Sequence, residues 1–333
     1  MDKEEARLLR IVDRFRGRRI AVWGDFILDE YLYGRTRRIS REAPVLIISY
    51  EHGEFSLGGA GNSVLNLEAL GASPLPIGVV GRDESGQKII DFLRGRSIST
   101  RFLLRSGELR TPIKMRVLAG EENTRKQQIL RIDKDSVVPD RPALKKRLRQ
   151  GLRDASSRCA ALLVSDYNYM TVRADIYIEI LPLYTKRKLP LTLDSRFRLL
   201  HFSGMTAATP NEPEVEDALK VELGENAKLL VKAGSRLLRR LQSPALLVTR
   251  GSRGLALFES GRSPFLIPVH GSTDIVDVTG AGDTVISVFT LALACGAAFR
   301  DAARLANFAG GIVVMKKGTA TVTAQELKDA ISS

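Results

Sequence analysis

The sequence has few cysteines and no long hydrophobic run. Its two cysteines, Cys159 and Cys295, cannot provide a disulfide framework, and so few thiols in 333 residues are typical of a reducing compartment. The longest apolar run, Val285–Phe299, is interrupted by serine, threonine and glycine and is shorter than the ~20 residues of a membrane-spanning helix. The charged start, Met1–Arg7, lacks the apolar stretch of a secretory signal. We therefore expect a cytoplasmic protein that does not insert into membranes.

The composition is otherwise that of an ordinary folded protein. Hydrophobic residues make up 44% and charged residues 27% of the chain, and 333 residues can bury a sizeable core. The formal net charge is +13, but the basic residues are dispersed and mostly lie at helical spacing beside leucine. We interpret them as solvated helix faces, because no groove-reading or base-stacking element that would indicate a nucleic-acid partner accompanies them.

Apolar β-branched runs alternate with amphipathic stretches for most of the chain. The runs predict strands at Arg19–Trp23, Leu75–Val80, Ala160–Ser165, Pro190–Asp194, Ala207–Thr209 and Ala245–Thr249. The amphipathic stretches predict helices at Asn62–Leu70, Gly86–Arg94, Ala143–Ser156, Arg173–Arg187 and Asn226–Leu241. This order predicts an α/β fold with a mostly parallel central sheet, flanked by helices, that binds ligands at the carboxyl ends of its strands.

Two segments break this alternation. Residues 31–50 and 111–132 contain short strand-like runs joined by polar turns such as Gly120–Asn123. We expect them to pair as a small antiparallel β lid over the ligand-binding edge. Since no proline- or serine-rich linker and no repeat of fixed period interrupts the chain, we expect residues 1–333 to form one domain that carries this lid.

The strongest local motif is Asp277–Thr284, which precedes an apolar helix. Its small residues allow backbone N–H groups to approach an anion, and the helix start adds roughly half a positive charge. Asp283 then stands as a base beside an anion site, which is the pairing that phosphoryl transfer to an alcohol needs. The same residues also fit a tight turn at Gly280 and Gly282, with Asp283 as a helix cap.

A second glycine cluster, Gly58–Asn62, opens another predicted helix. Gly58 and Gly59 would allow the backbone to approach a ligand closely, and Asn62 can both donate to and accept from sugar hydroxyls. The chain contains neither G-x-x-x-x-G-K-[ST] nor G-x-G-x-x-G, so an ordinary P-loop or dinucleotide-binding enzyme is disfavoured.

Together the two clusters resemble the ribokinase (phosphofructokinase-B) family of sugar and nucleoside kinases. That family has a Gly-Gly element with an Asn and, later, a helix-opening Gly-Ala-Gly-Asp, and Gly58–Gly81 and Asp277–Asp283 match both in order and spacing. Val64 and Val288 depart from the family pattern only in apolar packing. The resemblance implies a ribokinase-like fold and an ATP-dependent carbohydrate kinase with a carboxylate base. The implied catalytic residues are Asp283, Gly280, Ala281 and Gly282.

The resemblance also implies two cation sites. Asn211 and Glu214 look like the family's Asn-x-x-Glu element, which holds Mg²⁺ through water near the nucleotide phosphates, and their oxygens suit this ion. A helix start capped by Asn211 is the alternative. Asp277 and Thr279 stand where some relatives bind a monovalent cation, which adds K⁺ to the expected cofactors ATP and Mg²⁺.

Further matches concern the nucleotide. Residues 249–254 follow a predicted strand and resemble the loop that lines the nucleotide phosphates, although a plain β-turn would have the same pattern. Asn307 falls where relatives contact the adenine region, and a polar helix residue is the alternative. The implied nucleotide-binding residues are Asn211, Glu214, Thr249, Arg250, Gly251, Gly254 and Asn307.

Within the family, the chain is similar to the heptose 7-phosphate kinases of lipopolysaccharide precursor synthesis. The matching stretches are Gly24–Tyr31, Arg38–Val45, Gln127–Asp133 and Ser165–Tyr167. This resemblance implies phosphorylation of heptose 7-phosphate at the anomeric hydroxyl, which gives heptose 1,7-bisphosphate. The lid cations would neutralise the substrate phosphate and Asp25 would bind sugar hydroxyls, with solvated lid charge and a capping role as alternatives. The expected substrate-binding residues are Asp25, Asp29, Gly58, Gly59, Asn62, Lys114, Arg116, Gln128, Arg131 and Asp166.

Three departures leave the identity of the sugar open. Arg41 stands where those kinases usually have proline, Asn168–Met170 replaces Ala-Lys-Gly, and Ser195–Arg196 replaces Pro-Lys. Two lysines are thereby missing from the expected substrate edge, and Arg196 and Arg198 are the candidates to replace them. Another sugar, sugar phosphate or nucleoside is therefore an alternative substrate.

Two further expectations concern partners and class. Many of those kinases are fused to a nucleotidyltransferase domain, and we expect this chain to hold only the kinase half. Lid strands with open edges often pair across a two-fold axis, so we expect a homodimer through the lid. An alternative of a different class is a catalytically silent ligand-sensing protein on the kinase fold.

Overall fold

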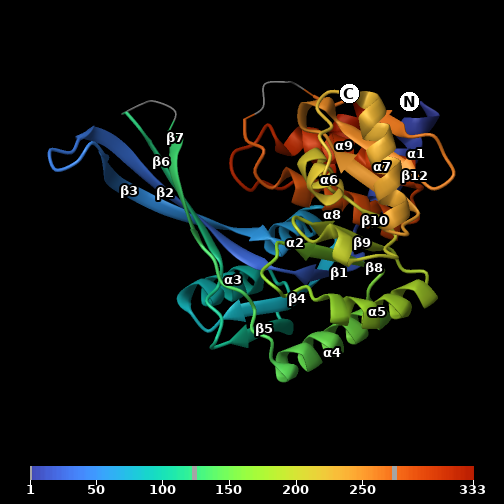
Figure 1. The fold of residues 1–333 in the computed structure, drawn as a ribbon, viewed down its shortest axis with the longest axis horizontal. Coiled ribbons are helices and arrows are strands. Elements are labelled where there is room, and N and C mark those ends of the chain that lie inside the picture. Colours follow the sequence, from blue (N-terminus) through green and yellow to red (C-terminus); the bar gives the residue numbers. More distant parts are fainter. Residues whose placement is uncertain (1, 122–125, 272–275) are drawn as a thin grey trace.

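A mostly parallel sheet forms the centre of the molecule (Figure 1). The computed structural model describes residues 2–121, 126–271 and 276–333. Within these residues, nine strands make the sheet in the order β13-β12-β11-β10-β9-β8-β1-β4-β5. They are β1 Arg19–Gly24, β4 Ser73–Gly81, β5 Phe102–Ser106, β8 Ala161–Asp166, β9 Leu191–Ser195, β10 Ala207–Ala208, β11 Ala245–Thr249, β12 Leu255–Glu259 and β13 Phe265–Ile267. Only the pairings of β12, with β11 and with β13, are antiparallel.

Helices cover both faces of this sheet. In the described residues they are α1 Lys3–Asp13, α2 Ala60–Ala69, α3 Glu84–Gly95, α4 Pro142–Arg158, α5 Ala174–Lys186, α6 Glu212–Leu219, α7 Ala227–Arg240, α8 Ala281–Ala294, α9 Phe299–Val313 and α10 Ala324–Ser332. Alternate side chains of β1 point to opposite faces. Ile20 and Val22 pack with residues of α2, α8 and α9, whereas Ala21 and Trp23 pack with residues of α4, α5 and α7. The predicted helix-flanked α/β sheet is therefore confirmed.

The remaining strands form the lid, which projects from the body as an arm (Figure 1). They are β2 Phe26–Ile39, β3 Leu46–Gly59, β6 Ile113–Gly120 and β7 Gln127–Lys134. The pairs β2–β3 and β6–β7 are antiparallel, and β2 and β6 join the two hairpins in parallel. The strands reach beyond the expected segment 31–50 at the root of the arm, because Phe26, Leu28 and Leu57 pack into the body core. Residues 122–125 of the expected turn lie outside the described residues.

The two cysteines and most of the longest apolar run of the sequence lie in the interior of the body. Cys159 and Cys295 are free, buried thiols. In the ranges that the structure describes, no helix has both the length and the apolar character needed to cross a bilayer. Helix α8, whose residues 283–293 are all buried, packs between α2, α9 and the sheet instead.

Candidate active site

A cavity of about 450 Å³ opens where the strand ends of the body meet the root of the lid. The lid contributes Ile27, Asp29, Gly58, Gly59, Lys114, Arg116 and Arg131 to its lining. The strand ends and following loops contribute Asp166, Tyr167, Asp194, Arg196, Thr209, Asn211, Glu214 and Thr249. The C-terminal part contributes Val278, Thr279, Gly280, Gly282, Asp283 and Thr319. This is the edge at which parallel α/β sheets bind ligands.

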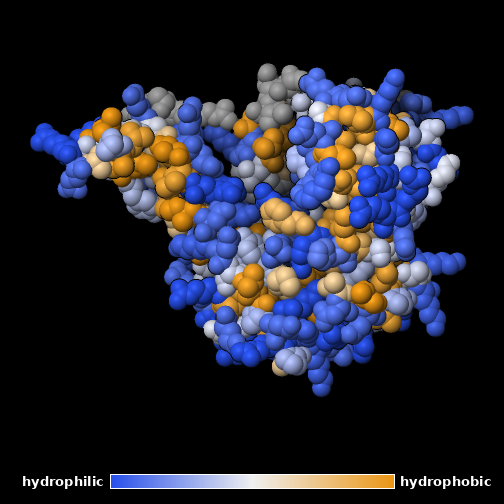
Figure 2. Space-filling view, in the orientation of Figure 1, coloured by the Kyte–Doolittle hydropathy of each residue, from blue (hydrophilic) through white to orange (hydrophobic). Residues whose placement is uncertain are grey.

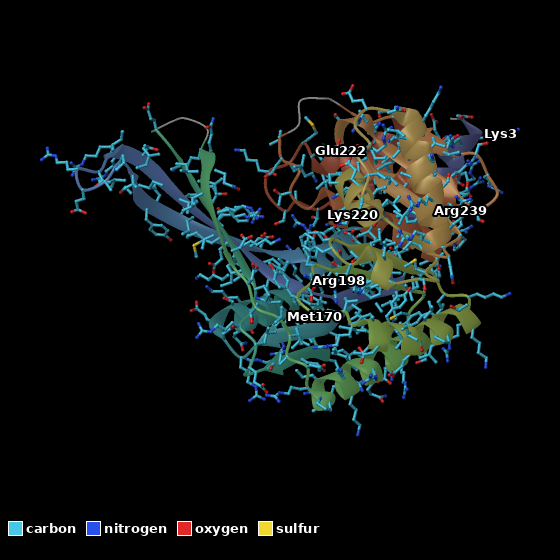
Figure 3. The ribbon with its side chains drawn as sticks, viewed as in Figure 1. Lys3, Met170, Arg198, Lys220, Glu222 and Arg239 are labelled. Atoms are coloured by element: carbon cyan, nitrogen blue, oxygen red, sulfur yellow. The ribbon has the colours of Figure 1, made fainter. Side chains whose placement is uncertain are left out.

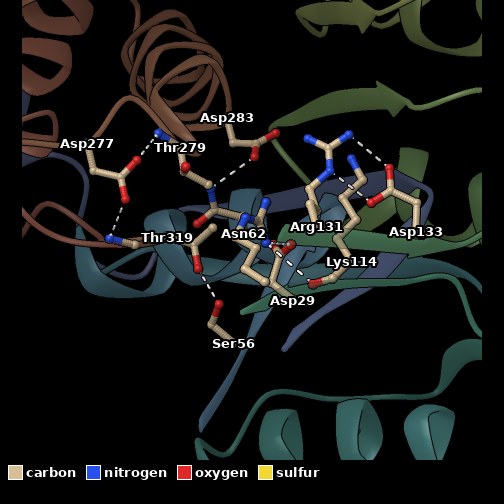
Figure 4. Close-up of polar contacts among 12 residues, drawn as sticks. Asp29, Ser56, Asn62, Lys114, Arg131, Asp133, Asp277, Thr279, Asp283 and Thr319 are labelled. Carbon is tan, nitrogen blue, oxygen red and sulfur yellow. Dashed lines mark hydrogen bonds and ion pairs between the residues drawn. The ribbon is translucent and has the colours of Figure 1, made fainter. Parts of the chain in front are cut away.

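Asp283 lies at the centre of this cleft, in the first turn of α8 (Figure 4). Its side chain is buried, with the residue 3% exposed. Asn62 Nδ2 donates to Asp283 Oδ2 over 2.9 Å, and Tyr167 Oη donates to Oδ1 over 3.1 Å. Burial raises the pKa of Asp283 to about 7, against the opposing effect of these two donors. A carboxylate with a pKa near neutrality suits a general base.

Glycine is required at the start of α8 for two reasons. Gly280, the residue before the helix, has a left-handed φ of 78°. A Cβ atom there would also lie 2.4 Å from Asn62 Nδ2, so any side chain would displace the amide that holds Asp283. Gly282 faces open space, with no atom within 4 Å of an added Cβ. The first N–H of α8, that of Ala281, donates to the Val278 carbonyl oxygen over 3.2 Å, which leaves the N–H groups of Gly280 and Gly282 on either side of it for an anion in the cleft.

Four cations line the cleft, three on the lid and one on the loop after β9, and two of them are already paired. Arg116 Nη1 donates to Asp29 Oδ1 over 2.5 Å, and the guanidinium of Arg131 forms two hydrogen bonds of 2.9 Å with Asp133 (Figure 4). Both pairs neutralise their arginines; the Arg116–Asp29 pair also joins β6 to β2, whereas Arg131 and Asp133 lie on the same strand, β7.

Lys114 and Arg196 are the other two cations, and neither forms an ion pair within the described residues. The Lys114 ammonium lies 5.1 Å from the centre of the Tyr167 ring. Burial, and then the charge of Arg196, lower the pKa of Lys114. Two neighbouring cations with no carboxylate within ion-pair distance in the described residues have the charge to receive an anion.

Asn211 and Glu214 lie across the cleft and also cap α6. Asn211 Oδ1 accepts from the Glu214 N–H over 2.8 Å, and Glu214 Oε2 accepts from the Asn211 N–H over 2.9 Å. Both predicted roles, helix cap and cleft residue, are thus compatible with one geometry. Burial raises the pKa of Glu214 to about 7. Burial also raises the pKa of the adjacent Asp194, as do the charges of Glu214 and Asp283.

A divalent cation fits this wall of the cleft. Glu214 Oε1 takes no part in the cap, and Thr209 Oγ1 beside it is buried without a hydrogen-bond partner in the described residues. Carboxylate, amide and water oxygens are the ligands that Mg²⁺ prefers. No group of three or more His, Cys, Asp or Glu side chains in residues 2–121, 126–271 and 276–333 is arranged to hold a metal by itself. Bound phosphate oxygens and water would therefore have to complete the coordination.

A second, mostly apolar pocket of about 140 Å³ adjoins the cleft and shares Thr249, Val278 and Gly282 with it. Its apolar lining is Leu255, Val269, Val285 and Val314. The predicted nucleotide residues Gly251, Gly254 and Asn307 also line it. A Cβ atom at Gly254 would lie 2.1 Å from the Ile267 carbonyl oxygen, so this turn requires glycine. The pocket has the size and character to receive a planar base.

Several predicted residues lie outside the cleft. Asp25 is buried, and its carboxylate accepts three backbone N–H groups from the loop Tyr167–Thr171. Its position favours anchoring of that loop over direct contact with a sugar. Gln128 lies on the exposed edge strand β7 and does not line the cleft. Arg250 pairs with Glu212 instead of facing the nucleotide pocket, with Nε 2.9 Å from Oε1.

The remaining predicted residues support loops around the cleft. The carboxylate of Asp277 accepts the N–H groups of Thr279 and Gly318 over 2.9 and 3.0 Å, and of the predicted cation pair only Thr279 lines the cavity (Figure 4). Asn62 is fully buried behind Asp283, to which it donates. Asp166 lines the cleft and also binds Arg198.

Of the two arginines expected to replace missing lysines, only Arg196 is available. Arg198 donates to Asp166 and, over 2.8 Å, to the Val172 carbonyl oxygen, and it lies against Met170 (Figure 3). Arg196 is exposed and lines the cleft. Tyr167 and Asp194 also line it, although neither was expected as a site residue; their positions at the ends of β8 and β9 were the available signal.

A comparison with models of known protein families identifies the family of the chain. The model described as pfkB family carbohydrate kinase matches residues 18–326. The chain belongs to the pfkB carbohydrate kinase family. As a pfkB kinase it is a phosphotransferase whose acceptor is an alcohol group of a sugar. The alternative of a catalytically silent sensor is therefore set aside.

Bacterial relatives of this pfkB kinase are considerably longer. The bifunctional protein HldE of Geobacter metallireducens is 38% identical over 307 residues, which are 92% of this chain and 61% of that protein. The bifunctional protein HldE of Pelobacter propionicus is 35% identical over 323 residues, which are 97% of this chain and 65% of that protein. The pfkB kinase chain thus spans less than two thirds of the length of these relatives.

Solved structures of two kinases share the fold. Ribokinase of Arabidopsis thaliana, complexed with ribose and ATP, is 20% identical with a TM-score of 0.71 and covers 96% of this chain and 99% of its own. Phosphofructokinase-2 of Escherichia coli, in complex with fructose-6-phosphate, is 16% identical with a TM-score of 0.75 and covers 95% of this chain and 98% of its own. The expected ribokinase-like fold is confirmed.

The raised pKa of Asp283 makes the stability of the protein depend on pH. The unfolded chain ionises this carboxyl near its ordinary pKa of 3.8, whereas the folded protein does so only at about 7. Between these values folding loses up to about 1.4 kcal/mol per pH unit from this group. We expect Asp283→Asn to remove this loss, so that its Tm relative to wild type rises between about pH 4 and pH 7 in calorimetry and levels off above that range. Tm curves that stay parallel over this range would contradict the burial argument.

Proposed function

We propose that this enzyme works in the cytoplasm and, with Mg²⁺, transfers the γ-phosphoryl group of ATP to the anomeric hydroxyl of heptose 7-phosphate. The product would be heptose 1,7-bisphosphate. The observation that supports the proposal most is a single cleft that holds Asp283 at the start of α8 together with Lys114 and Arg196. A base, an anion-binding helix start and a second anion site therefore lie within reach of one small molecule.

The residues of the cleft divide the chemistry among them. Asp283 accepts the proton of the sugar hydroxyl as its oxygen attacks the γ-phosphorus. The N–H groups at Gly280 and Gly282 stabilise the charge that develops on the transferred group, whereas the Ala281 N–H donates to the Val278 carbonyl oxygen over 3.2 Å and keeps the turn in place. Magnesium held by Asn211 and Glu214, through water, would neutralise charge on the nucleotide phosphates. The adjoining apolar pocket near Asn307 receives the nucleotide base.

The two cations without partners support a phosphorylated acceptor. Lys114 and Arg196 approach the cleft from the lid and from the loop after β9, and their mutual repulsion would be relieved by a dianionic phosphate. The motif resemblance to heptose 7-phosphate kinases and the relatives named HldE support heptose 7-phosphate as that acceptor.

Another phosphorylated sugar is the second candidate, and one residue favours it. Arg196 stands where the heptose kinases usually have lysine, and it lines the cleft, whereas the altered run Asn168–Met170 does not. A guanidinium binds a phosphate with two parallel hydrogen bonds, whereas an ammonium group acts as a point charge. The phosphate of the sugar would therefore take a different position and orientation at Arg196 than at a lysine.

The lid supports the proposal of a homodimer. Half-exposed or exposed apolar side chains gather on the projecting arm, as Figure 2 shows. They are Ile39, Val45, Leu46, Tyr50, Phe55, Ile129, Leu130 and Ile132, with Tyr50 67% and Ile39 64% exposed. The outer strands β3 and β7 also have unpaired edges in this sheet. An apolar arm with open edges is a typical dimer surface.

The base is tested by Asp283→Asn. A positioned base contributes ~10² to 10⁴ in rate, so we expect kcat to fall at least about a hundredfold. The affinity for ATP should stay nearly unchanged, because the nucleotide pocket is intact. Kinetics by ADP release and nucleotide titration measure both, and turnover close to that of wild type would refute the assignment of Asp283.

The acceptor is tested with a panel of heptose 7-phosphate, other sugar phosphates, free sugars and nucleosides. We expect heptose 7-phosphate to have the highest kcat/KM by orders of magnitude. Loss of one charged hydrogen bond in Arg196→Gln should raise the KM for the sugar phosphate about tenfold or more, but not that for ATP. Arg239→Gln, on the outer face of α7, is the matched control (Figure 3). Equal activity on unphosphorylated heptose would exclude a phosphate site.

The dimer is tested by placing charge on the arm. We expect wild type to have twice the mass of one chain in light scattering at micromolar concentration, and Leu130→Glu to have the mass of one. Burial of a carboxylate in an apolar interface is costly, which is the reason for this expectation. Leu229→Glu, at an exposed apolar position on α7, should leave the mass unchanged. A wild-type monomer would remove the proposal.

A further inference from the structure

Tyr167 contacts the proposed base directly. Its Oη donates to Asp283 Oδ1 over 3.1 Å, while Asn62 Nδ2 donates to Oδ2 over 2.9 Å. A carboxylate held at one oxygen can still rotate about its last torsion, which has a broad energy profile. Donors on both oxygens fix the plane of the group, and each oxygen keeps a further lone pair for an acceptor hydroxyl.

The phenol of Tyr167 stays protonated when Asp283 is ionised. Burial, and then the charges of Asp283 and Asp194, raise the pKa of Tyr167 well above its ordinary value. The hydroxyl is therefore a permanent donor, and its hydrogen bond favours the charged form of Asp283. The Lys114 ammonium lies over the Tyr167 ring, 5.1 Å from the ring centre.

The loop that carries Tyr167 is held by a buried anion. Three alternate N–H groups of the loop Tyr167–Thr171 donate to the carboxylate of Asp25, over 2.9, 3.0 and 3.0 Å. The intervening Asn168 and Met170 have left-handed φ angles of 67° and 69°. This conformation turns the alternate N–H groups toward one point, as in the backbone nests that bind anions. Asp25 thus fixes the position of the Tyr167 backbone.

We propose that Tyr167 is a positioning residue, whose hydroxyl holds the Asp283 carboxylate in the orientation that accepts the proton of the sugar hydroxyl. The inference rests on the proposed role of Asp283 as base. In the step, the acceptor oxygen forms the new bond to γ-phosphorus, and the bond from that phosphorus to the ADP oxygen breaks. The hydroxyl proton passes to Asp283, while Tyr167 keeps its own proton. Asp25 acts indirectly, because it holds the loop that carries Tyr167.

The pH dependence of the reaction reports on this contact. Besides Asn62 and Tyr167, the charged groups near Asp283 are Asp29 on β2 and Lys114 on β6, together with Asp194 on β9. Tyr167→Phe leaves all of these in place and removes one donor that favours the ionised base. The pKa of Asp283 should therefore rise by about one unit. Because the base acts when ionised, the acid limb of kcat/KM should move to higher pH by the same amount.

The experiment compares Tyr167→Phe with Tyr169→Phe, measuring ADP release with the best acceptor of the panel between pH 5.5 and 9.5. Tyr169 belongs to the same loop, but its hydroxyl bonds to Asp135 outside the cleft, so it is the matched control. We expect kcat of Tyr167→Phe to fall about tenfold at neutral pH, with a smaller loss at high pH. The KM for ATP and the Tm should stay close to wild type, because the ring and its packing are retained.

Three outcomes separate this inference from the proposed function. A Tyr167→Phe profile with an unmoved acid limb, or a loss equal at every pH and shared by Tyr169→Phe, would overturn the positioning role. If Asp283→Asn is inactive and the acid limb of Tyr167→Phe is unmoved, the proposed base is retained and only the role of Tyr167 is rejected. An active Asp283→Asn would reject the base assignment, and the role of Tyr167 with it.

Discussion

The fold buries one carboxylate at a helix start without giving it a cation partner in the described residues. Asp283 is buried in the first turn of α8, where the helix start favours a negative charge and the surrounding protein opposes it. Two neutral donors balance these effects, Asn62 and Tyr167. A cation in direct contact would form an ion pair with the carboxylate and lower its pKa, which would make it a weak base. The lid cations do not do so: Arg116 and Arg131 pair with other carboxylates, and Lys114 lies over the Tyr167 ring.

The parts of the molecule that follow from short segments could be predicted from the sequence. Six strands and the main helices of the body were predicted from hydrophobic patterns within single short segments. The lid strands were predicted from the two segments that interrupt the alternation of strands and helices. The Gly-Ala-Gly-Asp element predicted the start of α8 with Asp283 in its first turn, because helix starts and glycine turns depend on neighbouring residues. Strands β5, β12 and β13 were not predicted, and β12 and β13 also leave the βα alternation, because β12 pairs antiparallel with both of its neighbours.

The roles that depend on distant contacts could not be predicted. Asn62 was expected to bind sugar, but it donates to a carboxylate 221 positions away, and only the packing of α2 against α8 brings them together. Asp25 was also expected at the sugar, but it accepts three N–H groups of a loop that turns them toward it through the left-handed conformations of Asn168 and Met170. Methionine is an unusual residue for that conformation, so the sequence carries no signal for it. Gln128 is exposed because its strand lies at the sheet edge.

The pairing along the arm is irregular at two places. Strands β2 and β3 run from the cleft, at Asp29 and Gly58, to the apolar tip, and their pairing shifts register between Tyr33 and Gly34 and again between Thr36 and Arg38. Such irregularities bend a ribbon and sharpen its twist. Because both shifts lie between Gly58 at the root and the apolar tip, they set the direction in which the tip points away from the cleft wall.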